Sequence, residues 1–124
     1  MKIAIIGGGP GGYVAAIKAA MLGADVTVIE KRRVGGTCLN VGCIPTKALL
    51  ASSSMLNNIK EAKSFGINID GEINIDFSSI MSRKDKIVNQ LINGIEFLFE
   101  KRGINLINGF GKLIDKNNIE VTMD

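Results

Sequence analysis

Residues 2–12 read KIAIIGGGPGG, and this stretch decides the fold. Residues 2–6 are a continuous run rich in isoleucine, which is typical of a strand buried on both faces of a parallel sheet. The six residues that follow satisfy the spacing G-x-G-x-x-G with Gly7, Gly9 and Gly12. The stretch therefore predicts a buried strand that ends in a glycine-rich turn.

The residues after this turn predict a helix and a second strand. Residues 13–22 are rich in alanine and have a helical pattern, and Gly23 stands where a left-handed C-terminal cap is needed. Residues 25–29 return to β-branched side chains, and Glu30 stands at their end. Strand, glycine turn, helix, strand and acid in this order predict the start of a Rossmann-like α/β fold.

Each glycine of the turn has a physical role in binding a dinucleotide. Gly7 permits the tight turn, Gly9 lets the backbone approach a pyrophosphate, and Gly12 lets the helix pack closely on the strand. The pyrophosphate lies at the helix N-terminus, where free N–H groups and the helix dipole favour an anion. Glu30 is placed to accept hydrogen bonds from a ribose hydroxyl, and an acid here disfavours a 2′-phosphate. These residues predict FAD or NAD as the ligand, whereas the alternative is a plain glycine-rich turn followed by a surface carboxylate.

The chain contains two cysteines, Cys38 and Cys43, within the stretch GGTCLNVGCIPTK at residues 35–47. Residues five apart in a regular helix are separated by about 7.5 Å along the axis, whereas a disulfide needs Cα atoms no more than about 7 Å apart. A bond between them therefore requires a distorted backbone, for which Gly42 supplies freedom and Pro45 prevents a regular continuation. Such a bond is readily reduced, as a catalytic disulfide must be. The alternative is a pair of free or buried thiols.

The remaining residues predict a scaffold of helices and short strands. Residues 46–63 favour a helix, and residues 64–74 favour an extended connection or a weak hairpin. Asp76 has the properties of an N-cap, opening a long amphipathic helix that Gly103 ends. Residues 104–107, 112–114 and 119–122 are predicted to form a short β-meander with turns at 108–109 and 115–118. The inward face of the long helix is predicted to carry Ile80, Ile87, Leu91, Ile95 and Leu98.

Composition narrows the classes of function. The chain has 124 residues, is 46% hydrophobic and carries a net charge of +3, so it has the size of one globular domain. Its compact basic run, residues 31–33, is interpreted as a solvated loop, and aromatic residues for nucleic-acid stacking are scarce. No segment has the length of a membrane span or a signal-peptide core, so we expect a cytoplasmic protein. A structural zinc site needs about four ligands, and the chain has two cysteines and no histidine. We therefore expect no metal site.

Residues 36–47 closely resemble the redox-active disulfide motif of the class I pyridine nucleotide–disulfide oxidoreductases. Residues 9–16, 47–50 and 108–112 are similar to that family too, and the resemblance covers essentially the whole chain. Thr46 departs from the usual serine but keeps a hydroxyl. The resemblance implies a Rossmann-like FAD-binding fold with two long inserted helices, in which FAD rather than NAD occupies this first glycine turn.

The resemblance also implies a role for individual residues. Cys43 would be the thiol nearest the flavin, Cys38 would exchange with a dithiol substrate, and Lys47 would lie by the flavin ring. Glu30 and Lys31 would hold the adenosine end of FAD. Residues facing the pyrophosphate would be Gly7, Gly9, Pro10, Gly11 and Gly12, those lining the flavin side would be Gly36, Thr37 and Cys38, and Gly111 would contact FAD through its backbone.

Within the family, the sequence is most similar to the members that oxidise protein-bound dihydrolipoamide and pass the electrons through disulfide and FAD to NAD. This implies a lipoyl-bearing subunit of a 2-oxoacid dehydrogenase or related complex as partner, and a homodimer. The sequence has no histidine for the family's acid–base pair and no second G-x-G-x-x-G. We therefore expect residues 1–124 to be the amino-terminal part of an incomplete FAD-binding domain, inactive alone. The alternatives are a glutathione, trypanothione or mercuric reductase, or a non-catalytic flavin-binding or thiol-switch module.

Overall fold

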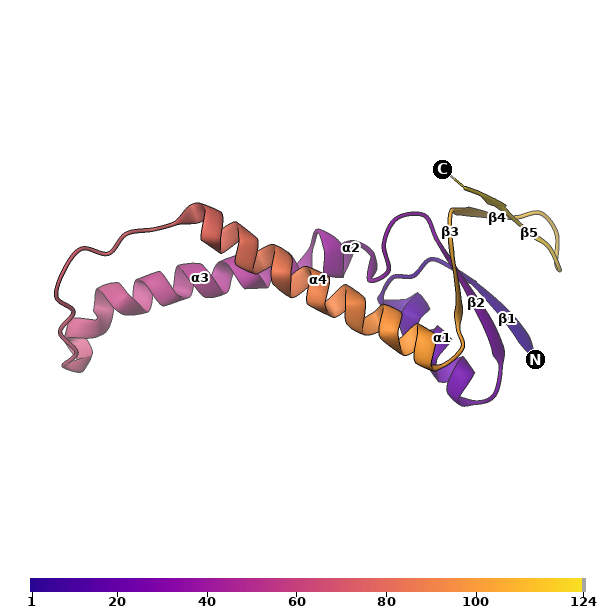
Figure 1. Ribbon diagram of the computed structural model, residues 1–124, viewed down its shortest axis with the longest axis horizontal. Coiled ribbons are helices and arrows are strands. Elements are labelled where there is room, and N and C mark those ends of the chain that lie inside the picture. Colours follow the sequence, from indigo (N-terminus) through magenta and orange to yellow (C-terminus); the bar gives the residue numbers. More distant parts are fainter. Residues whose placement is uncertain (124) are drawn as a thin grey trace.

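A computed structural model describes residues 1–123 as a mixed α/β structure, with its strands at one end and two long helices extending from them (Figure 1). The glycine turn joins the first strand to the first helix, and the two cysteines lie where two later helices meet. The chain forms, in order, β1 (Lys2–Ile6), α1 (Pro10–Met21), β2 (Asp25–Glu30), α2 (Gly36–Asn40), α3 (Cys43–Glu61), a 3-10 helix (Ala62–Phe65), α4 (Phe77–Lys101), β3 (Asn105–Asn108), β4 (Phe110–Leu113) and β5 (Ile119–Thr122).

The parallel sheet has the order β1-β2-β3, with β2 in the centre. Ile6 pairs with Ile29 and Glu30 pairs with Asn108, so the carboxyl ends of all three strands lie at one edge. In open α/β sheets, ligands bind at this edge. The Rossmann-like α/β fold predicted from the glycine turn is therefore confirmed. The core between sheet and helices consists of Ala16, Val26, Val28, Val34, Leu39, Val88, Ile92, Ile95, Phe99 and Ile104.

The first strand differs from the prediction in its burial. Residues of β1 alternate between exposed and half-buried, and Ile6 retains 50% of its accessible surface. The prediction of burial on both faces was wrong for this strand, because β1 is at the edge of the sheet and pairs only with β2. The fully buried positions belong to β2, where Val26 and Val28 are almost inaccessible.

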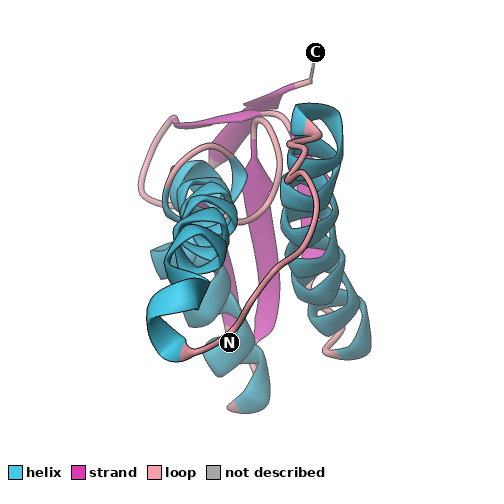
Figure 2. Cartoon of the chain, turned by 90° about the vertical axis from the view of Figure 1, so that its left-hand side faces the viewer, coloured by secondary structure: helices cyan, strands magenta, loops and turns pink. Residues whose placement is uncertain are grey.

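The helices α3 and α4 form an antiparallel arm that extends away from the sheet (Figure 1), and Figure 2 looks along this arm with the helices in front of the strands. Arg83 of α4 donates a hydrogen bond to the carbonyl oxygen of Ala48 on α3, at 3.2 Å. Residues 67–76, which join the helices, form no strand, so of the two predicted alternatives the structure has the extended connection. Among residues 1–123 no helix has both the length and the apolar character needed to cross a membrane.

The long helix α4 begins and ends where the sequence predicts, but it turns a different face inward. The Asp76 carboxylate caps it by accepting a hydrogen bond from the Ser79 N–H at 3.1 Å, and Gly103 beyond its end is left-handed with φ +65°. Of the predicted inward residues Ile95 is buried and Ile80 and Ile87 are half-buried, whereas the prediction was wrong for Leu91 and Leu98, which are exposed. The neighbouring helical stripe packs on the sheet instead, because both stripes have helical spacing and tertiary contacts choose between them. The buried residues of α4 are Val88, Ile92, Ile95 and Phe99.

Two helices begin earlier than predicted, each with a proline in its first turn. Helix α1 starts at Pro10 rather than at residue 13, and α3 starts at Cys43 rather than at residue 46. Pro45 was predicted to prevent a regular helix, but it is buried in the first turn of α3. A proline is tolerated there because the N–H groups of a first helical turn have no partner within the helix.

The carboxyl-terminal strands are not a three-stranded meander. β3 pairs in parallel with β2, whereas β4 and β5 form a separate antiparallel hairpin. The residues 108–109 therefore lead from the parallel sheet into the hairpin, and the Gly109 N–H donates to the Glu30 carbonyl oxygen at 2.9 Å. β3 joins β2 because the helices of the βαβ crossover return the chain to the parallel sheet, and this partner was not visible in the local turn signal.

Candidate dinucleotide site and cysteine pair

The glycine turn packs the first helix directly against the end of β1. Gly7 has φ +100°, a conformation that favours glycine, and its N–H donates to the Ile29 carbonyl oxygen at 2.7 Å. A Cβ atom on Gly12 would lie 1.8 Å from the Gly7 carbonyl oxygen. The roles predicted for Gly7 in the turn and for Gly12 in close packing therefore agree with their positions in the structure.

The N-terminus of α1 presents backbone N–H groups at this turn. Gly9 is its N-cap and Pro10 its first residue, and no side chain caps it. The first N–H groups of a helix have no partner within the helix, and together with the helix dipole they favour an anion. A dinucleotide pyrophosphate fits this position, since Gly9 and Gly11 carry no side chain that would block its approach.

Glu30 lies at the carboxyl end of β2, within hydrogen-bonding distance of the glycine turn. Its Oε2 accepts from the Gly8 N–H at 2.7 Å and its Oε1 accepts from the Arg32 N–H at 2.9 Å. The side chain is half-buried. The structure therefore brings the predicted ribose-binding acid to the turn predicted to hold the pyrophosphate, as the two ends of one ADP-like group require.

A second glycine loop connects the turn to the cysteine stretch. Gly35 and Gly36 have φ of +99° and +60°. The Gly35 N–H donates to the Gly8 carbonyl oxygen at 2.7 Å, and a Cβ atom on Gly36 would lie 2.8 Å from the Cα of Gly9. This close approach requires glycine at position 36 and holds the loop against the turn.

Two hollows at this edge of the sheet contain several of the predicted cofactor residues. A hollow of about 550 Å³ is bounded by Glu30, Lys31, Gly36 and Thr37. A smaller one of about 180 Å³ is bounded by Gly7, Gly111, Glu30 and Lys31. Because Glu30 and Lys31 border both hollows, the two adjoin. Size and lining fit the elongated shape of a dinucleotide.

The two cysteines lie on the neighbouring helices α2 and α3. Cys38 is in the middle of α2 and half-buried, and Cys43 is the first residue of α3 and exposed, both as free thiols. The helical path is broken at Val41 and Gly42, the distortion that a bond between the cysteines requires. A Cβ atom on Gly42 would lie 2.9 Å from the Thr37 carbonyl oxygen and 3.2 Å from the Cα of Cys38. The absence of a side chain at Gly42 thus lets α2 and α3 approach each other.

The two thiols interact with each other. A side-chain hydrogen bond with Cys43 raises the pKa of the Cys38 thiol, and partial burial and the charge of Cys43 raise it further. The charge of Lys47 acts in the opposite direction, which places this lysine near the pair. Lys47 is exposed, one turn after Cys43 on α3. The pair and the lysine therefore form one cluster at the N-terminus of a long helix, where an anion is favoured.

Sequence reasoning missed several residues at this site. Arg32, Arg33, Asn40 and Val41 also border the larger hollow. Arg33 Nη2 donates to Asn89 Oδ1 on α4 at 3.1 Å, a tie between residues that are distant in the sequence. The position of Asn40 between the two cysteines was a usable signal, because asparagine side chains often bond to nearby backbone groups.

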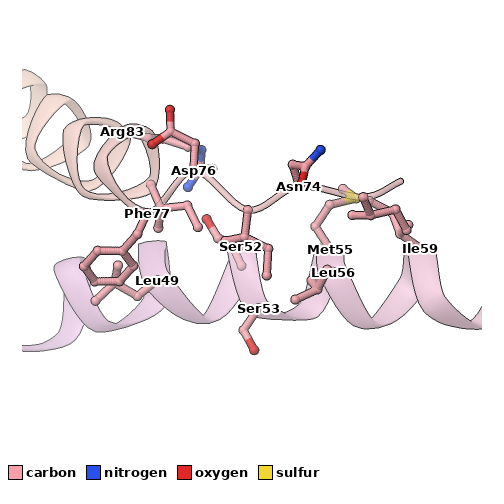
Figure 3. A pocket seen from close by; sticks show the side chains of 14 residues that line it. Leu49, Ser52, Ser53, Met55, Leu56, Ile59, Asn74, Asp76, Phe77 and Arg83 are labelled. Atoms are coloured by element: carbon pink, nitrogen blue, oxygen red, sulfur yellow. The ribbon is translucent and has the colours of Figure 1, made fainter. Parts of the chain in front are cut away.

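A third hollow lies outside this cluster. It has a volume of about 730 Å³ and is enclosed by α3, the connection to α4 and the start of α4. Figure 3 shows Leu49, Met55 and Phe77 among the apolar side chains that line it, with Arg83 and Asp76 at one end. None of the predicted site residues lines this hollow. Residues 1–123 also include no group of three or more acidic, cysteine or histidine side chains arranged to hold a metal ion.

A Rossmann-like fold whose glycine-rich turn is followed in space by a loop and a pair of cysteines is the arrangement expected of a dinucleotide-dependent thiol–disulfide oxidoreductase. The sequence pattern of the pyridine nucleotide-disulphide oxidoreductase family matches residues 1–124, and the chain belongs to this family. This membership agrees with the resemblance of residues 36–47 to the redox-active disulfide motif of the same family.

Individual relatives share about half of the residues. The chain is 52% identical to dihydrolipoyl dehydrogenase of Acholeplasma laidlawii over 120 residues, which cover 97% of this chain and 36% of the relative. It is 47% identical to the dihydrolipoyl dehydrogenase of Bacillus subtilis over 120 residues, 96% of this chain and 26% of the relative. The crystal structure of LpdA from Mycobacterium tuberculosis superposes with a TM-score of 0.89 at 29% identity, over 99% of this chain and 28% of that one. The chain thus spans about a quarter to a third of these relatives.

Proposed function

We propose that these residues form the FAD-binding and disulfide-bearing part of a protein that oxidises protein-bound dihydrolipoamide, with NAD as the final electron acceptor. The observation that carries the proposal is the position of Cys38 in α2 and of Cys43 at the start of α3, after a loop that touches the glycine turn. The high identity to dihydrolipoyl dehydrogenases supports the choice of substrate over glutathione disulfide or mercuric ion.

The residues that would hold FAD lie along the carboxyl edge of the sheet. The backbone of Gly7, Gly9, Pro10, Gly11 and Gly12 would surround the pyrophosphate at the start of α1. Glu30 and Lys31 would bind the adenosine end, Gly36 and Thr37 would line the flavin side, and Gly111 would contact FAD through its backbone. Bound FAD supplies an acceptor for two electrons, which these side chains do not supply themselves.

The cysteines would act by thiol–disulfide exchange. In the oxidised pair, a thiolate of the dithiol substrate attacks the sulfur of Cys38, which forms a mixed disulfide and releases Cys43 as a thiolate. The second substrate thiolate then attacks the substrate sulfur of this mixed disulfide and releases Cys38. The substrate leaves as a disulfide, and the pair has gained its two electrons as two thiol groups. Cys43 is the first residue of α3, and the N-terminus of a helix favours an anion at this position.

The remaining parts of the proposal concern the whole protein. Its partner would be a lipoyl-bearing subunit of a 2-oxoacid dehydrogenase or related complex, and it would act as a cytoplasmic homodimer. The 124-residue chain alone would not turn over, because it has no histidine to serve as acid–base catalyst and one G-x-G-x-x-G instead of two.

The test is an assay of the whole protein that carries these residues, in parallel with its Cys38→Ser variant. We expect NAD reduction with dihydrolipoamide, no comparable turnover with glutathione disulfide or mercuric ion, and loss of activity in the variant. Full activity of Cys38→Ser would remove the cysteine pair from the mechanism. A preference for glutathione disulfide or mercuric ion would replace the proposed substrate, and FAD absorbance from bound cofactor checks that each preparation is loaded.

A further inference from the structure

Asn40 links the helix that carries Cys38 to the loop that lies against the dinucleotide turn. It is the last residue of α2, two positions after Cys38 and three before Cys43, and its side chain is half-buried. Its Nδ2 donates to the carbonyl oxygens of Gly36 at 2.9 Å and Val34 at 3.1 Å, with a longer contact of 3.4 Å to that of Arg33. All three partners are acceptors, so the amide nitrogen is the atom that faces them.

The loop held by Asn40 is the one that contacts the glycine turn. The Gly35 N–H is bonded to the Gly8 carbonyl oxygen, and Gly36 packs on Gly9 without room for a side chain. The bond to Gly36 lies within α2, whereas the bonds to Val34 and Arg33 join α2 to the loop of residues 33–35 and, through this loop, to the turn predicted to hold the pyrophosphate.

Helix α2 needs such support because it has only five residues. A helix of this length is unstable by itself, and its position depends on contacts outside it. Cys38 lies in its middle, and the distance from Cys38 to Cys43 depends on how α2 sits against the N-terminus of α3. Along the chain, only Val41 and Gly42 connect the two helices. The angle between α2 and α3 therefore also depends on contacts outside this connection.

We propose that Asn40 is a positioning residue that sets the redox equilibrium of the cysteine pair by holding α2 against the loop of residues 33–35. This inference rests on the proposed function in one respect, namely that Cys38 and Cys43 form a reversible disulfide. Asn40 takes no part in the thiol–disulfide exchange itself and acts only through the position of Cys38. Its amide keeps Cys38 within bonding reach of Cys43, which raises the effective concentration of one thiol near the other.

The experiment measures the equilibrium between glutathione and the Cys38–Cys43 pair in the whole protein that carries these residues. The reaction converts two thiols of the chain and one glutathione disulfide into the chain disulfide and two glutathione thiols. The ratio is read by alkylation and mass spectrometry in the wild type, Asn40→Ala, Asn40→Asp and the control Asn58→Ala. Asp keeps the size of the side chain but presents only acceptors to the three carbonyl groups. Asn58 is an exposed residue of α3, outside this cluster.

We expect the equilibrium constant for disulfide formation to fall about ten-fold in Asn40→Ala, because the variant loses one or two hydrogen bonds. In Asn40→Asp the constant should fall by at least the same factor. Asn58→Ala should match the wild type. Wild-type constants in both Asn40 variants would overturn the inference while the cysteine pair stays redox-active. Unfolding of both variants beside a folded control, detected by circular dichroism, would also overturn it, because Asn40 would then support the whole fold. A wild-type whole protein that forms no Cys38–Cys43 disulfide would instead contradict the proposed function.

Discussion

Gly12 lies so close to Gly7 that a Cβ atom on Gly12 would come within 1.8 Å of the Gly7 carbonyl oxygen. The contact is between backbone atoms of a helix and a turn, so neither side can move away without displacing α1 from β1. Two residues five positions apart thus determine both the packing of the first βαβ unit and the shape of the predicted pyrophosphate site.

Gly12→Ala is therefore expected to destabilise the chain and to abolish FAD binding. Overpacking of this kind costs about 1–3 kcal/mol, and the backbone location favours the upper part of that range. The measurements are thermal unfolding and titration of FAD by fluorescence. Gly11→Ala is the matched control for stability, since a Cβ atom there would meet nothing within 4 Å. Equal melting temperatures for the two variants would show that the close packing of Gly12 is dispensable.

Cys38 is expected to titrate above the ordinary pH range of a thiol, because a side-chain hydrogen bond with Cys43 raises its pKa. Its rate of alkylation should thus increase at a higher pH than the rate of an ordinary thiol does. In Cys43→Ala the hydrogen bond and the neighbouring charge are both removed, so the pKa of Cys38 should fall and the rate profile should move to lower pH. Alkylation by iodoacetamide followed across pH by mass spectrometry measures both profiles. Identical profiles would mean that the thiols do not interact.

The cap of α4 predicts a pH dependence of stability. Hydrogen bonds from Ser79 and Ser78 lower the pKa of Asp76 to about 2 from 3.8. A depressed folded-state pKa stabilises the fold above the unfolded value, and this contribution is lost as the pH falls from about 4 to about 2. Asp76→Ala should thus lower the melting temperature at pH 7, with a difference from the wild type that shrinks across this window.

Asp70→Ala is the control for that comparison, since Asp70 is an exposed acid in the connection between α3 and α4. It should leave the melting temperature unchanged at both ends of the pH range. A difference between wild type and Asp76→Ala that stays constant down to pH 2 would show that the capping carboxylate does not carry the effect.

Local chemistry made part of this structure predictable. The turn at Gly7 to Gly12 and the cap at Asp76 depend on residues a few positions apart, and both are as predicted. The buried face of α4 and the partner of β3 depend on how distant elements pack, and the predictions were wrong for part of that face and for that partner. Periodicity could not separate two adjacent helical stripes that differ by one residue.

In the candidate site, too, some features could be predicted from nearby residues and others could not. The cysteines and the glycines carry motifs that can be recognised in the sequence; the structure places the glycine turn at the carboxyl edge of the sheet and the cysteines on α2 and α3. Asn40 is no part of such a motif: its place between the cysteines was a usable signal for a bond to nearby backbone, but it did not show which carbonyl groups surround the side chain. The hydrogen bond from Arg33 to Asn89 spans two elements and was equally invisible.

Gly42 is expected to control whether the cysteines can meet. A Cβ atom there would lie 2.9 Å from the Thr37 carbonyl oxygen and 3.2 Å from the Cα of Cys38, so Gly42→Ala must push α2 away from the start of α3. The clash is local, at the junction of two helices, and the buried residues of the sheet lie elsewhere. We therefore expect Gly42→Ala to keep its helical circular dichroism. The equilibrium constant for forming the Cys38–Cys43 disulfide should fall at least about ten-fold, which corresponds to a free-energy cost in the usual range of overpacking.

Gly94→Ala is the matched control, because a Cβ atom at Gly94 meets nothing within 4 Å in the middle of α4. It should leave the disulfide equilibrium unchanged and raise stability by about 0.5–1 kcal/mol, since glycine is unfavourable inside a helix. An unchanged disulfide equilibrium in Gly42→Ala would mean that the pair closes without close contact between α2 and α3, and the geometric basis for the redox role would then be lost.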